Sequence, residues 1–414
     1  VVAPNGTGVP AFEEALRAGR SGVRANAQMA EGGFACQVAG VPEGTDELAQ
    51  KSFDPELLLA MNGSHRYAAL AALEAWLDAG LARPAPDSDA VDWGAGCVLG
   101  TGIGGMDTIA ARVVPLVDQK KVRRLGSTAV EQVMASGVSA RLSGLFALGN
   151  QVTTNSSACS TGTEAVIEGM LRIRHGLAER MLCGGVEAAS HYIWAGFDAM
   201  RVLAKAWNDD PERASRPLSA SAGGFVPAAG AGVLLLESLD AARARGARIR
   251  AEVLGGALNC GGHRGGGSMT APNPAGVERC IRAALADAEV APDAVDVIDG
   301  HLTATGADPR EVHAWARALG RPPERFPALT ATKSLIGHAL GAAGGIECAA
   351  SVLMAQGGFV HASRNCEDVH PDVADFAGAI AHETRAIPGL RAVAKAGFGF
   401  GDVNAVVLFG PLPR

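Results

Sequence analysis

The chain has 414 residues, 54 of them glycine, and it is 48% hydrophobic, 5% aromatic and 19% charged. A chain of this length buries about 75% of its unfolded surface, so it needs no disulfide or metal to hold its core. The formal net charge of −7 gives no electrostatic support for nucleic acid or an anionic membrane as a partner.

Apolar runs typical of buried parallel strands alternate with Ala- and Leu-rich stretches along the whole chain. This alternation predicts an α/β protein. In chain order we expect a helix at 67–79, a strand at 96–100, a helix at 163–175, strands at 180–183, 232–237 and 248–254, a helix at 277–288, a strand at 295–299, a helix at 310–319, a strand at 328–332, a helix at 342–355, and strands at 391–396 and 405–409.

The middle of the chain predicts a division into two halves. The charged segment 239–246 joins the strands expected at 232–237 and 248–254, and we interpret this strand pair as a midpoint. We therefore expect two α/β halves, residues 1–240 and residues 241–414. No sequence repeat between the halves is visible.

The glycine-rich segment 100–105 matches G-x-G-x-x-G and follows an expected strand, as in a dinucleotide-binding turn. That motif also requires an acidic residue at the end of a second strand about 20 residues later. Here the segment 117–124 is a basic run rather than a strand end. We therefore favour a packing turn over a cofactor site.

This basic run is the densest in the chain and contains Lys120, Lys121, Arg123 and Arg124. A protein of net charge −7 that docks an acidic partner needs such a local cluster. The alternative interpretation is a solvated loop face.

Cys159 lies just before an expected helix, and Thr161 followed by Glu164 predicts a capping box at its start. The positive end of a helix favours a thiolate over a thiol. From an ordinary pKa of ~8.5 we therefore expect this thiol to titrate at ~7–8. The alternative is a cysteine that only fills space in the core.

Two histidines follow apolar strands in the second half. His301 ends the strand-like run 295–300, and His338 precedes the small-residue helix that starts near Ala342. Loops at the ends of strands are where α/β proteins place their sites. A lone loop histidine is usually structural, but a cysteine and two histidines in the same topological position indicate a site.

The eight cysteines are scattered and form no C-x-x-C pair. This argues against a zinc site and a disulfide framework, and it favours a reducing, cytoplasmic environment. No signal peptide is recognised, and the longest uncharged apolar stretch, 222–236, is too short and too rich in Gly and Pro to span a bilayer.

Four ordered motifs resemble those of the β-ketoacyl-acyl-carrier-protein synthases, the condensing enzymes with the thiolase fold, and the resemblance covers nearly the whole chain. The Cys-His-His pattern is similar to the elongating branch (KAS I/II type) rather than the initiating branch, whose triad resembles Cys-His-Asn. The motifs are Ala158-Cys159-Ser160-Thr161-Gly162, His301-x-Thr303-x-Thr305, Lys333-Ser334-x-x-Gly337-His338 with Gly341-Ala342-Ala343-Gly344, and Gly397-Phe398-Gly399-Phe400-Gly401.

The resemblance implies two duplicated α/β halves in a layered α-β-α-β-α arrangement. It implies that Cys159 takes the growing acyl chain as a thioester, and that His301 and His338 hold the malonyl thioester oxygen while carbon dioxide leaves. Lys333 and Glu347 resemble the family's supporting ion pair, for which the alternative is a purely structural pair. The product would be a 3-oxoacyl thioester, made by decarboxylative Claisen condensation.

The same resemblance implies that the backbone N–H groups of Cys159 and Phe400 form an oxyanion hole. Phe400 would be a gate and Phe398 a wall beside it. The residues implied in binding the acyl chain and the phosphopantetheine arm are Ile103, Phe197, Thr303 and Thr305.

Three departures from the family pattern put the substrate range and the gate in doubt. Leu302 stands where Gly is usual, in a loop that is one residue shorter, and it adds bulk beside a catalytic histidine. Asp402 adds a carboxylate to the gate. Gly223 stands where the family has Asp, in a segment that lacks its usual Arg as well. These departures are typical of a specialised branch, such as polyketide, polyene or pigment synthesis.

The family implies an acyl carrier protein as partner, a homodimer with a heterodimer as the alternative, and no resident cofactor or metal, since phosphopantetheine carries the substrates. A second hypothesis is a non-catalytic, chain-length-factor-like partner subunit. Such partners usually lack the nucleophile that this sequence retains. A Rossmann-type oxidoreductase or an unrelated Cys-His hydrolase is a third class, which lacks comparable support.

Overall fold

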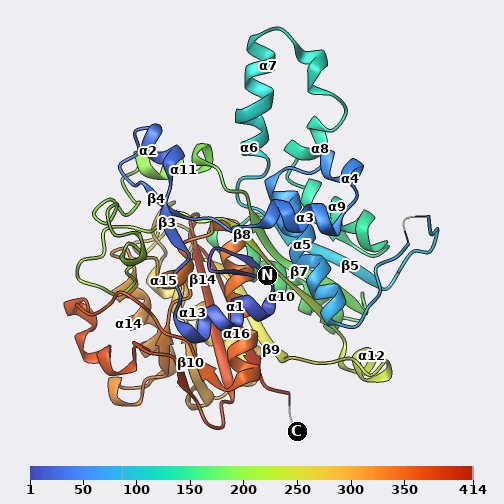
Figure 1. Cartoon of the computed structure of the whole chain (residues 1–414). Helices are drawn as coiled ribbons and strands as arrows, with labels where there is room; N and C mark the ends of the chain where they lie inside the picture. Colours follow the sequence, from blue (N-terminus) through green and yellow to red (C-terminus); the bar gives the residue numbers. More distant parts are fainter. Residues whose placement is uncertain (86, 413–414) are drawn as a thin grey trace.

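The computed structural model describes residues 1–85 and 87–412 (Figure 1). Its first sheet has the strand order β2-β1-β8-β7-β5-β6. The pairs β5–β6 and β5–β7 are parallel, whereas β7–β8, β8–β1 and β1–β2 are antiparallel. The strands are β1 (Val2–Ala3), β2 (Gly6–Thr7), β5 (Ala95–Gly100), β6 (Val152–Thr153), β7 (Arg180–Glu187) and β8 (Gly230–Glu237).

The second sheet has the order β11-β10-β14-β15-β9 and is also mixed. The pairs β10–β11 and β10–β14 are parallel, and β14–β15 and β15–β9 are antiparallel. Its strands are β9 (Glu252–Cys260), β10 (Val295–Asp299), β11 (Ala328–Thr330), β14 (Ala392–Gly399) and β15 (Val403–Gly410). Two short antiparallel pairs lie outside these sheets: β3 (Val23–Ala25) with β4 (Val38–Gly40), and β12 (Phe359–Val360) with β13 (Arg385–Ala386).

Two helices lie between the sheets. Helix α10 (Thr161–Arg174) packs on β5 and β7 with one side and on β9 and β15 with the other, and α16 (Ala343–Gly357) packs on β8 and on β14. Helices α5 (Gly63–Asp78) and α9 (Gly137–Phe146) cover the outer face of the first sheet, while α13 (Pro274–Asp287) covers that of the second and packs against α14 (Asp308–Leu319). The predicted α-β-α-β-α thiolase-like arrangement is confirmed.

Shorter helices and turns complete the chain. They are α1 (Val9–Ala18), α2 (Ala27–Glu31), α3 (Thr45–Ser52), α4 (Pro55–Leu59), α6 (Met106–Thr108), η1 (Ile109–Val113), α7 (Val114–Asp118), η2 (Val122–Leu125), α8 (Ala129–Val133), η3 (Ala158–Ser160), α11 (His191–Ala199), η4 (Pro211–Arg213), α12 (Leu239–Ala244), η5 (Pro292–Ala294), η6 (Pro323–Arg325), α15 (Lys333–Ile336), η7 (Leu340–Ala342) and η8 (Pro371–Ala379). Helices α6 and α7 project from the body of the molecule at the top of Figure 1.

Glycines allow the two central helices to approach each other and the first sheet closely. A Cβ atom on Gly162 of α10 would lie 2.3 Å from the backbone N of Gly345 on α16. A Cβ on Gly345 would in turn lie 2.3 Å from the carbonyl oxygen of Gly232 on β8. Much of the glycine content near the middle layer is thus explained by backbone-to-backbone packing.

The two strands expected on either side of the midpoint, at 232–237 and 248–254, belong to different sheets. The first lies in β8 of the first sheet, while the second strand starts later, at Glu252, and belongs to the second sheet. Both sheets also contain antiparallel strands, which their uniformly apolar sequences do not reveal. The division at residue 240 stays a prediction. Among the described residues, no helix is long and apolar enough to cross a membrane.

Candidate active site

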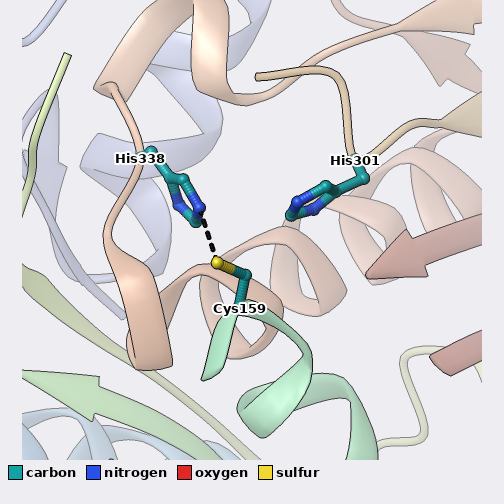
Figure 2. Close-up of side chains that lie close together, drawn as sticks. All are labelled: Cys159, His301 and His338. Atoms are coloured by element: carbon teal, nitrogen blue, oxygen red, sulfur yellow. Dashed lines mark hydrogen bonds between the residues drawn. The ribbon is translucent and has the colours of Figure 1, made fainter. Parts of the chain in front are cut away.

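Three predicted residues from distant parts of the chain meet in space (Figure 2). One nitrogen of His301, one nitrogen of His338 and the sulfur of Cys159 all lie within 4.8 Å of one another. The two imidazole rings are 5.6 Å apart and nearly perpendicular, at 86°. The ends of β10, α15 and η3 therefore converge on one point, as the sequence predicts.

Cys159 lies in the 3₁₀ turn η3, directly before α10. The preceding residue, Ala158, has a φ of 50°, a conformation that costs energy for a residue with a Cβ and that is common at functional turns. The predicted capping box is absent, because the Thr161 hydroxyl donates to the carbonyl oxygen of Ala158 at 2.7 Å and accepts from the N–H of Ser157 at 2.8 Å. Thr161 therefore closes the turn that presents the cysteine.

The expected lowering of the Cys159 pKa is wrong. Burial raises the pKa of this thiol to about 11, although Lys333 and the backbone N–H of Phe400 lower it. Loss of water around the sulfur therefore outweighs the helix terminus and the nearby cation. The resting group is a thiol, held close to donors that would stabilise its anion.

The hydrogen bonds of His338 assign its neutral form. Its Nδ1 accepts a hydrogen bond from the N–H of Leu340 at 3.2 Å, so the proton of the neutral ring is on Nε2. That Nε2 lies 3.0 Å from the Cys159 sulfur. His338 therefore presents an N–H to the reacting position rather than a lone pair.

His301 is arranged in the same way. The Lys333 ammonium donates to its Nδ1 at 3.4 Å, which again leaves the proton on Nε2. Burial lowers the pKa of both histidines well below the ordinary value, and Lys333 lowers them further. Both rings are consequently neutral donors at neutral pH, a form suited to stabilising an oxyanion.

Lys333 is held by Glu347, as the sequence predicts, with 2.5 Å between Nζ and Oε1. Sequence reasoning missed a second lysine, Lys395 on β14, whose Nζ lies 2.8 Å from the other carboxylate oxygen of Glu347. All three side chains are buried. A lysine inside an apolar strand run is the signal that could have identified it.

The loop that carries His301 is fixed by two buried carboxylates that sequence reasoning also missed. Glu311 accepts hydrogen bonds from the N–H groups of His301 and Leu302, at 2.7 and 2.9 Å. Asp308 accepts from the N–H of Thr303 at 2.8 Å. Leu302 points into the core of the second half and does not line the active-site cavity. The bulk of the leucine side chain therefore does not narrow the cavity.

A cavity of about 370 Å³ leads to these residues. Its wall contains most of the predicted gate and substrate residues, namely Phe197, Thr303, Thr305, Phe398 and Phe400. Phe225, which sequence reasoning did not select, stacks edge-on at 5.1 Å from His338. Thr270, from the loop after β9, is a further lining residue that was missed.

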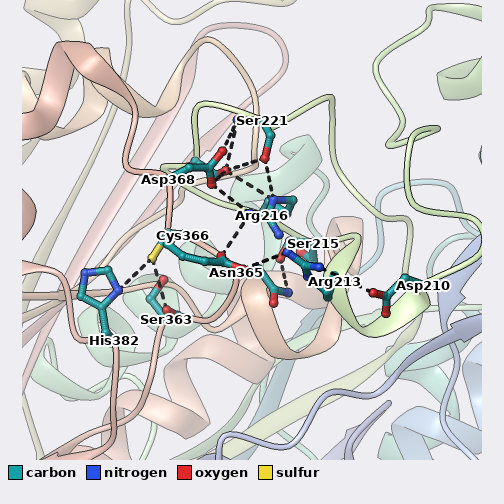
Figure 3. Close-up of polar contacts among 12 residues, drawn as sticks. Asp210, Arg213, Ser215, Arg216, Ser221, Ser363, Asn365, Cys366, Asp368 and His382 are labelled. Carbon is teal, nitrogen blue, oxygen red and sulfur yellow. Dashed lines mark hydrogen bonds and ion pairs between the residues drawn. The ribbon is translucent and has the colours of Figure 1, made fainter.

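The segment before Phe225 is anchored by a buried arginine (Figure 3). Arg216 donates to Glu367 at 3.0 Å and to Asp368 at 2.9 Å. Burial would raise the pKa of Asp368, but hydrogen bonds from Ser219, Ser221 and Arg216 outweigh it, so the pKa is lowered. In the same segment the Ser215 hydroxyl donates to the carbonyl oxygen of Lys333 at 2.7 Å. This network fixes the backbone near Lys333 and Phe225. Gly223 is exposed, in the same segment just before Phe225.

Asp402 turns away from the gate. Its fully buried carboxylate accepts from the N–H groups of His263 at 3.0 Å and Asn273 at 2.7 Å. A Cβ on Gly261 or Gly267 would lie 2.3 Å from its oxygens, so these glycines make room for it. Asp402 therefore ties the gate to the loop 261–273 and adds no charge to the cavity.

Five residues that were predicted to contact the acyl chain or its carrier do not line this cavity. Ile103 is 40% exposed, at the base of the projecting segment. Lys120, Lys121, Arg123 and Arg124 are exposed farther along the same segment. Their predicted roles in acyl binding and carrier docking stay predictions.

A second cavity, of about 500 Å³, is lined by residues of α5, α10, α12, α16, β8 and β9. It contains none of the predicted site residues.

The chain matches two family models in succession. Residues 1–242 match the beta-ketoacyl synthase N-terminal domain, and residues 250–367 match the beta-ketoacyl synthase C-terminal domain. A curated relative, the 3-oxoacyl-[acyl-carrier-protein] synthase 1 of Haemophilus influenzae, is 33% identical over 396 residues, which are 95% of this chain and 93% of the relative.

Two solved structures are similar over nearly all of the chain. The ishigamide ketosynthase/chain length factor superposes with a TM-score of 0.87 at 30% identity, covering 100% of this chain and 97% of that one. The second structure is a type II polyketide synthase acyl-carrier protein in complex with its ketosynthase bound to the hexaketide. It superposes with a TM-score of 0.87 at 26% identity, covering 99% of this chain and 97% of that one. The chain therefore belongs to the beta-ketoacyl synthase family of acyl-transferring condensing enzymes.

Proposed function

We propose that this protein is a 3-oxoacyl-[acyl-carrier-protein] synthase that extends an acyl chain by decarboxylative Claisen condensation. The observation that carries the proposal is the pair of imidazole N–H donors that face the Cys159 sulfur inside a cavity open to substrate. A thiol nucleophile beside two neutral donors suits a reaction in which a thioester forms first and an enolate forms next.

In the first step the Cys159 sulfur attacks the acyl thioester carbonyl, the C–S bond to the carrier breaks, and the proton lost by Cys159 passes to the departing carrier sulfur, which leaves as a thiol. The backbone N–H groups of Cys159 and Phe400 would bind the oxygen of the tetrahedral intermediate. Support comes from the Phe400 N–H at the Cys159 sulfur and from Gly399, where a Cβ would lie 3.1 Å from the backbone N of Cys159. That close approach of the gate to the turn requires glycine.

In the second step the malonyl thioester loses carbon dioxide. The electron pair of the broken C–C bond moves onto the thioester as an enolate, whose oxygen His301 and His338 would stabilise by donating from Nε2. The enolate carbon then attacks the acyl-Cys159 carbonyl and expels the cysteine thiolate. The product is a 3-oxoacyl thioester with a chain two carbons longer.

The substrates would arrive on the phosphopantetheine arm of an acyl carrier protein. Thr303 and Thr305 line the cavity with their hydroxyl groups 3.0 Å apart, which suits the amide groups of that arm. The exposed cluster Lys120, Lys121, Arg123 and Arg124 is our proposed contact for an acidic carrier protein. No resident cofactor or metal is part of this mechanism.

We further propose that the protein functions as a dimer, with a homodimer as the expected form. The projecting segment exposes the large apolar side chains of Ile103, Val114, Val117, Val122 and Val130. Contiguous exposed apolar residues are typical of a protein interface. Such a contact would cover Ile103 and place it at the far end of an acyl tunnel.

The alternative, a non-catalytic subunit that sets chain length, is less consistent with the site. A subunit without catalysis needs neither the Cys159–His338 contact nor the Lys333–Glu347 pair, and both are formed.

The test is to incubate the protein with an acyl-carrier protein and malonyl-carrier protein and to analyse the carrier by mass spectrometry. We expect a 3-oxoacyl carrier from the native protein and none from Cys159→Ala. Absence of product with the native protein, in the presence of a functional acyl carrier, would support the partner-subunit alternative.

A further inference from the structure

Lys395 is a buried cation at the centre of the molecule. It projects from β14 toward α10 and α16, and its side chain is fully buried. Its Nζ donates to the Thr163 hydroxyl at 2.9 Å and to the carbonyl oxygen of Ala396 at 2.5 Å, and it lies 2.8 Å from Glu347. Every contact that holds this ammonium is therefore inside the protein.

Glu347 does not need Lys395 for charge neutrality, because Lys333 already pairs with its other oxygen at 2.5 Å. The next buried acid, Asp299, has its pKa raised to about 7 by burial and by Glu347. It is therefore only partly ionised at neutral pH. The cluster therefore places two lysines, one at each oxygen, against the single carboxyl group of Glu347.

The Lys395 side chain keeps its positive charge at neutral pH. Burial alone would favour the neutral amine, but Glu347, with Cys348 and Asp299, outweighs it and raises the pKa of Lys395. A buried unpaired lysine would instead lose its proton. The fold thus keeps a second cation behind the site at the cost of desolvating it.

The position of Lys395 links it to the reacting groups. Thr163, its hydroxyl partner, lies in the first turn of α10, just after Cys159. Lys395 lowers the pKa of Cys159, and it also lowers the pKa of His301 and of His338. The same strand continues to Phe398 and the gate. The titratable groups that face this cluster are Cys159, Asp299, His301, Lys333, His338, Glu347, Cys348 and His361.

We propose that Lys395 is a second positioning cation of the active site. It holds Glu347 on the side opposite to Lys333 and keeps Lys333 directed at His301. Its charge stabilises the two anions of the reaction, the Cys159 thiolate and the enolate. The effect on the enolate rests on the proposed function, whereas the effect on the Cys159 thiolate does not.

The test compares Lys395→Met, which keeps the length of the side chain and removes the charge, with Thr163→Val, which removes a hydrogen-bond partner and keeps the charge. Alkylation of Cys159 by iodoacetamide is followed by mass spectrometry as a function of pH. We expect Lys395→Met to react at least about threefold more slowly at pH 8, the change for half a pKa unit, with its profile displaced to higher pH. Thr163→Val should keep the native profile.

Chemical rescue provides a second measurement. Lys395→Ala leaves a space at the cluster, and methylammonium should restore part of its alkylation rate, whereas tetramethylammonium is too large to do so. Product formation from carrier substrates should decrease in Lys395→Met by a larger factor than alkylation does. If Lys395→Met loses product formation but keeps the native alkylation profile, the effect on the thiolate is refuted. The proposed condensation chemistry would still stand.

Removal of a buried charge can prevent folding, so Lys395→Gln and Lys395→Met are both checked by circular dichroism. Folded variants with native alkylation profiles would overturn the proposal. An equal displacement in Thr163→Val would assign the effect to packing and would also overturn it. If neither Lys395 variant folds while Thr163→Val does, Lys395 serves the fold and not the site, and the proposal is wrong.

Discussion

At the scale of single residues, the site is defined by where its protons lie. Each histidine uses Nδ1 as an acceptor within the protein and directs an N–H at the cavity, and the cysteine is a partly buried thiol. Cys159 must lose its proton before it attacks, whereas the histidines work as they are. The two kinds of group should therefore depend on pH differently.

The raised pKa of Cys159, about 11, predicts that only a small fraction of the group is thiolate at neutral pH. The rate of alkylation should then increase about tenfold per pH unit from pH 7 and level off only near pH 11. The experiment is done in a Cys260→Ser background, because Cys260 is an exposed cysteine whose own alkylation would interfere. A plateau near pH 8 would show instead that the helix terminus outweighs burial.

The neutral histidines predict a different profile for decarboxylation. Cys159→Gln, which resembles an acylated cysteine, should release carbon dioxide from malonyl-carrier protein at a rate that changes little between pH 6 and pH 8, because burial and Lys333 lower the pKa of both histidines well below the ordinary value. Replacing His301 or His338 with Ala should each reduce the rate by about 10²-fold or more. His175→Ala, at an exposed histidine, is the control. Full activity in either site variant would refute the two-donor mechanism.

Most of the site residues could be predicted from the sequence, because short motifs carry them. The buried acids Glu311 and Asp308 could not, since their partners are backbone N–H groups and no motif records which way a carboxylate turns. Asp402 illustrates the same limit. The sequence places its charge on the gate, whereas its backbone, with a φ of 61°, directs the carboxylate into the loop 261–273.

At the scale of elements, the middle layer depends on how closely α10, α16 and the first sheet approach. A Cβ on Gly345 would lie 2.3 Å from the carbonyl oxygen of Gly232. Because backbone atoms on both sides cannot move independently, Gly345→Ala should lower the free energy of unfolding by at least ~3 kcal/mol or prevent folding.

Gly144→Ala is the matched control for this substitution. It also places a methyl group on a helical glycine, in α9, but a Cβ there meets nothing within 4 Å. This variant should be neutral or more stable by up to ~1 kcal/mol, since Ala favours helix. Chemical denaturation of both variants tests the prediction, and equal losses would contradict it.

The limits of sequence reasoning at this scale lie in strand direction. The core strands at 295–299 and 405–409 are found close to their predicted positions, because their apolar runs are short and sharply bounded. Their apolar composition suggested parallel strands, yet β15 is antiparallel to both of its neighbours. Strands buried on both faces are apolar in either direction, so composition does not distinguish them.

At the scale of the whole molecule, the active-site cavity and the basic cluster are separate within one chain. The cluster lies on the segment that projects from the body in Figure 1, and it contributes nothing to the cavity wall. A role in docking therefore depends on long-range attraction or on a second subunit. The cluster itself could be predicted from the sequence, whereas its separation from the cavity could not, because it depends on the tertiary fold.

Charge reversal tests this role. Lys120→Glu with Lys121→Glu should raise the apparent KM for an acyl-carrier protein about tenfold at low salt, with little change for a small acyl thioester, because only the carrier is acidic. Lys51→Glu with Arg325→Glu makes the same change of charge at exposed residues elsewhere. Equal effects of the two pairs, or equal effects on both substrates, would identify the cluster as a solvated face.

The proposed reaction depends above all on Cys159 carrying the growing chain as a thioester, and intact-mass spectrometry after mixing with an acyl-carrier protein tests this most directly. We expect a mass increase of one acyl group on the native protein, lost on treatment with hydroxylamine and absent from Cys159→Ala. An acyl group that persists in Cys159→Ala, or no acyl group on folded native protein, would contradict it.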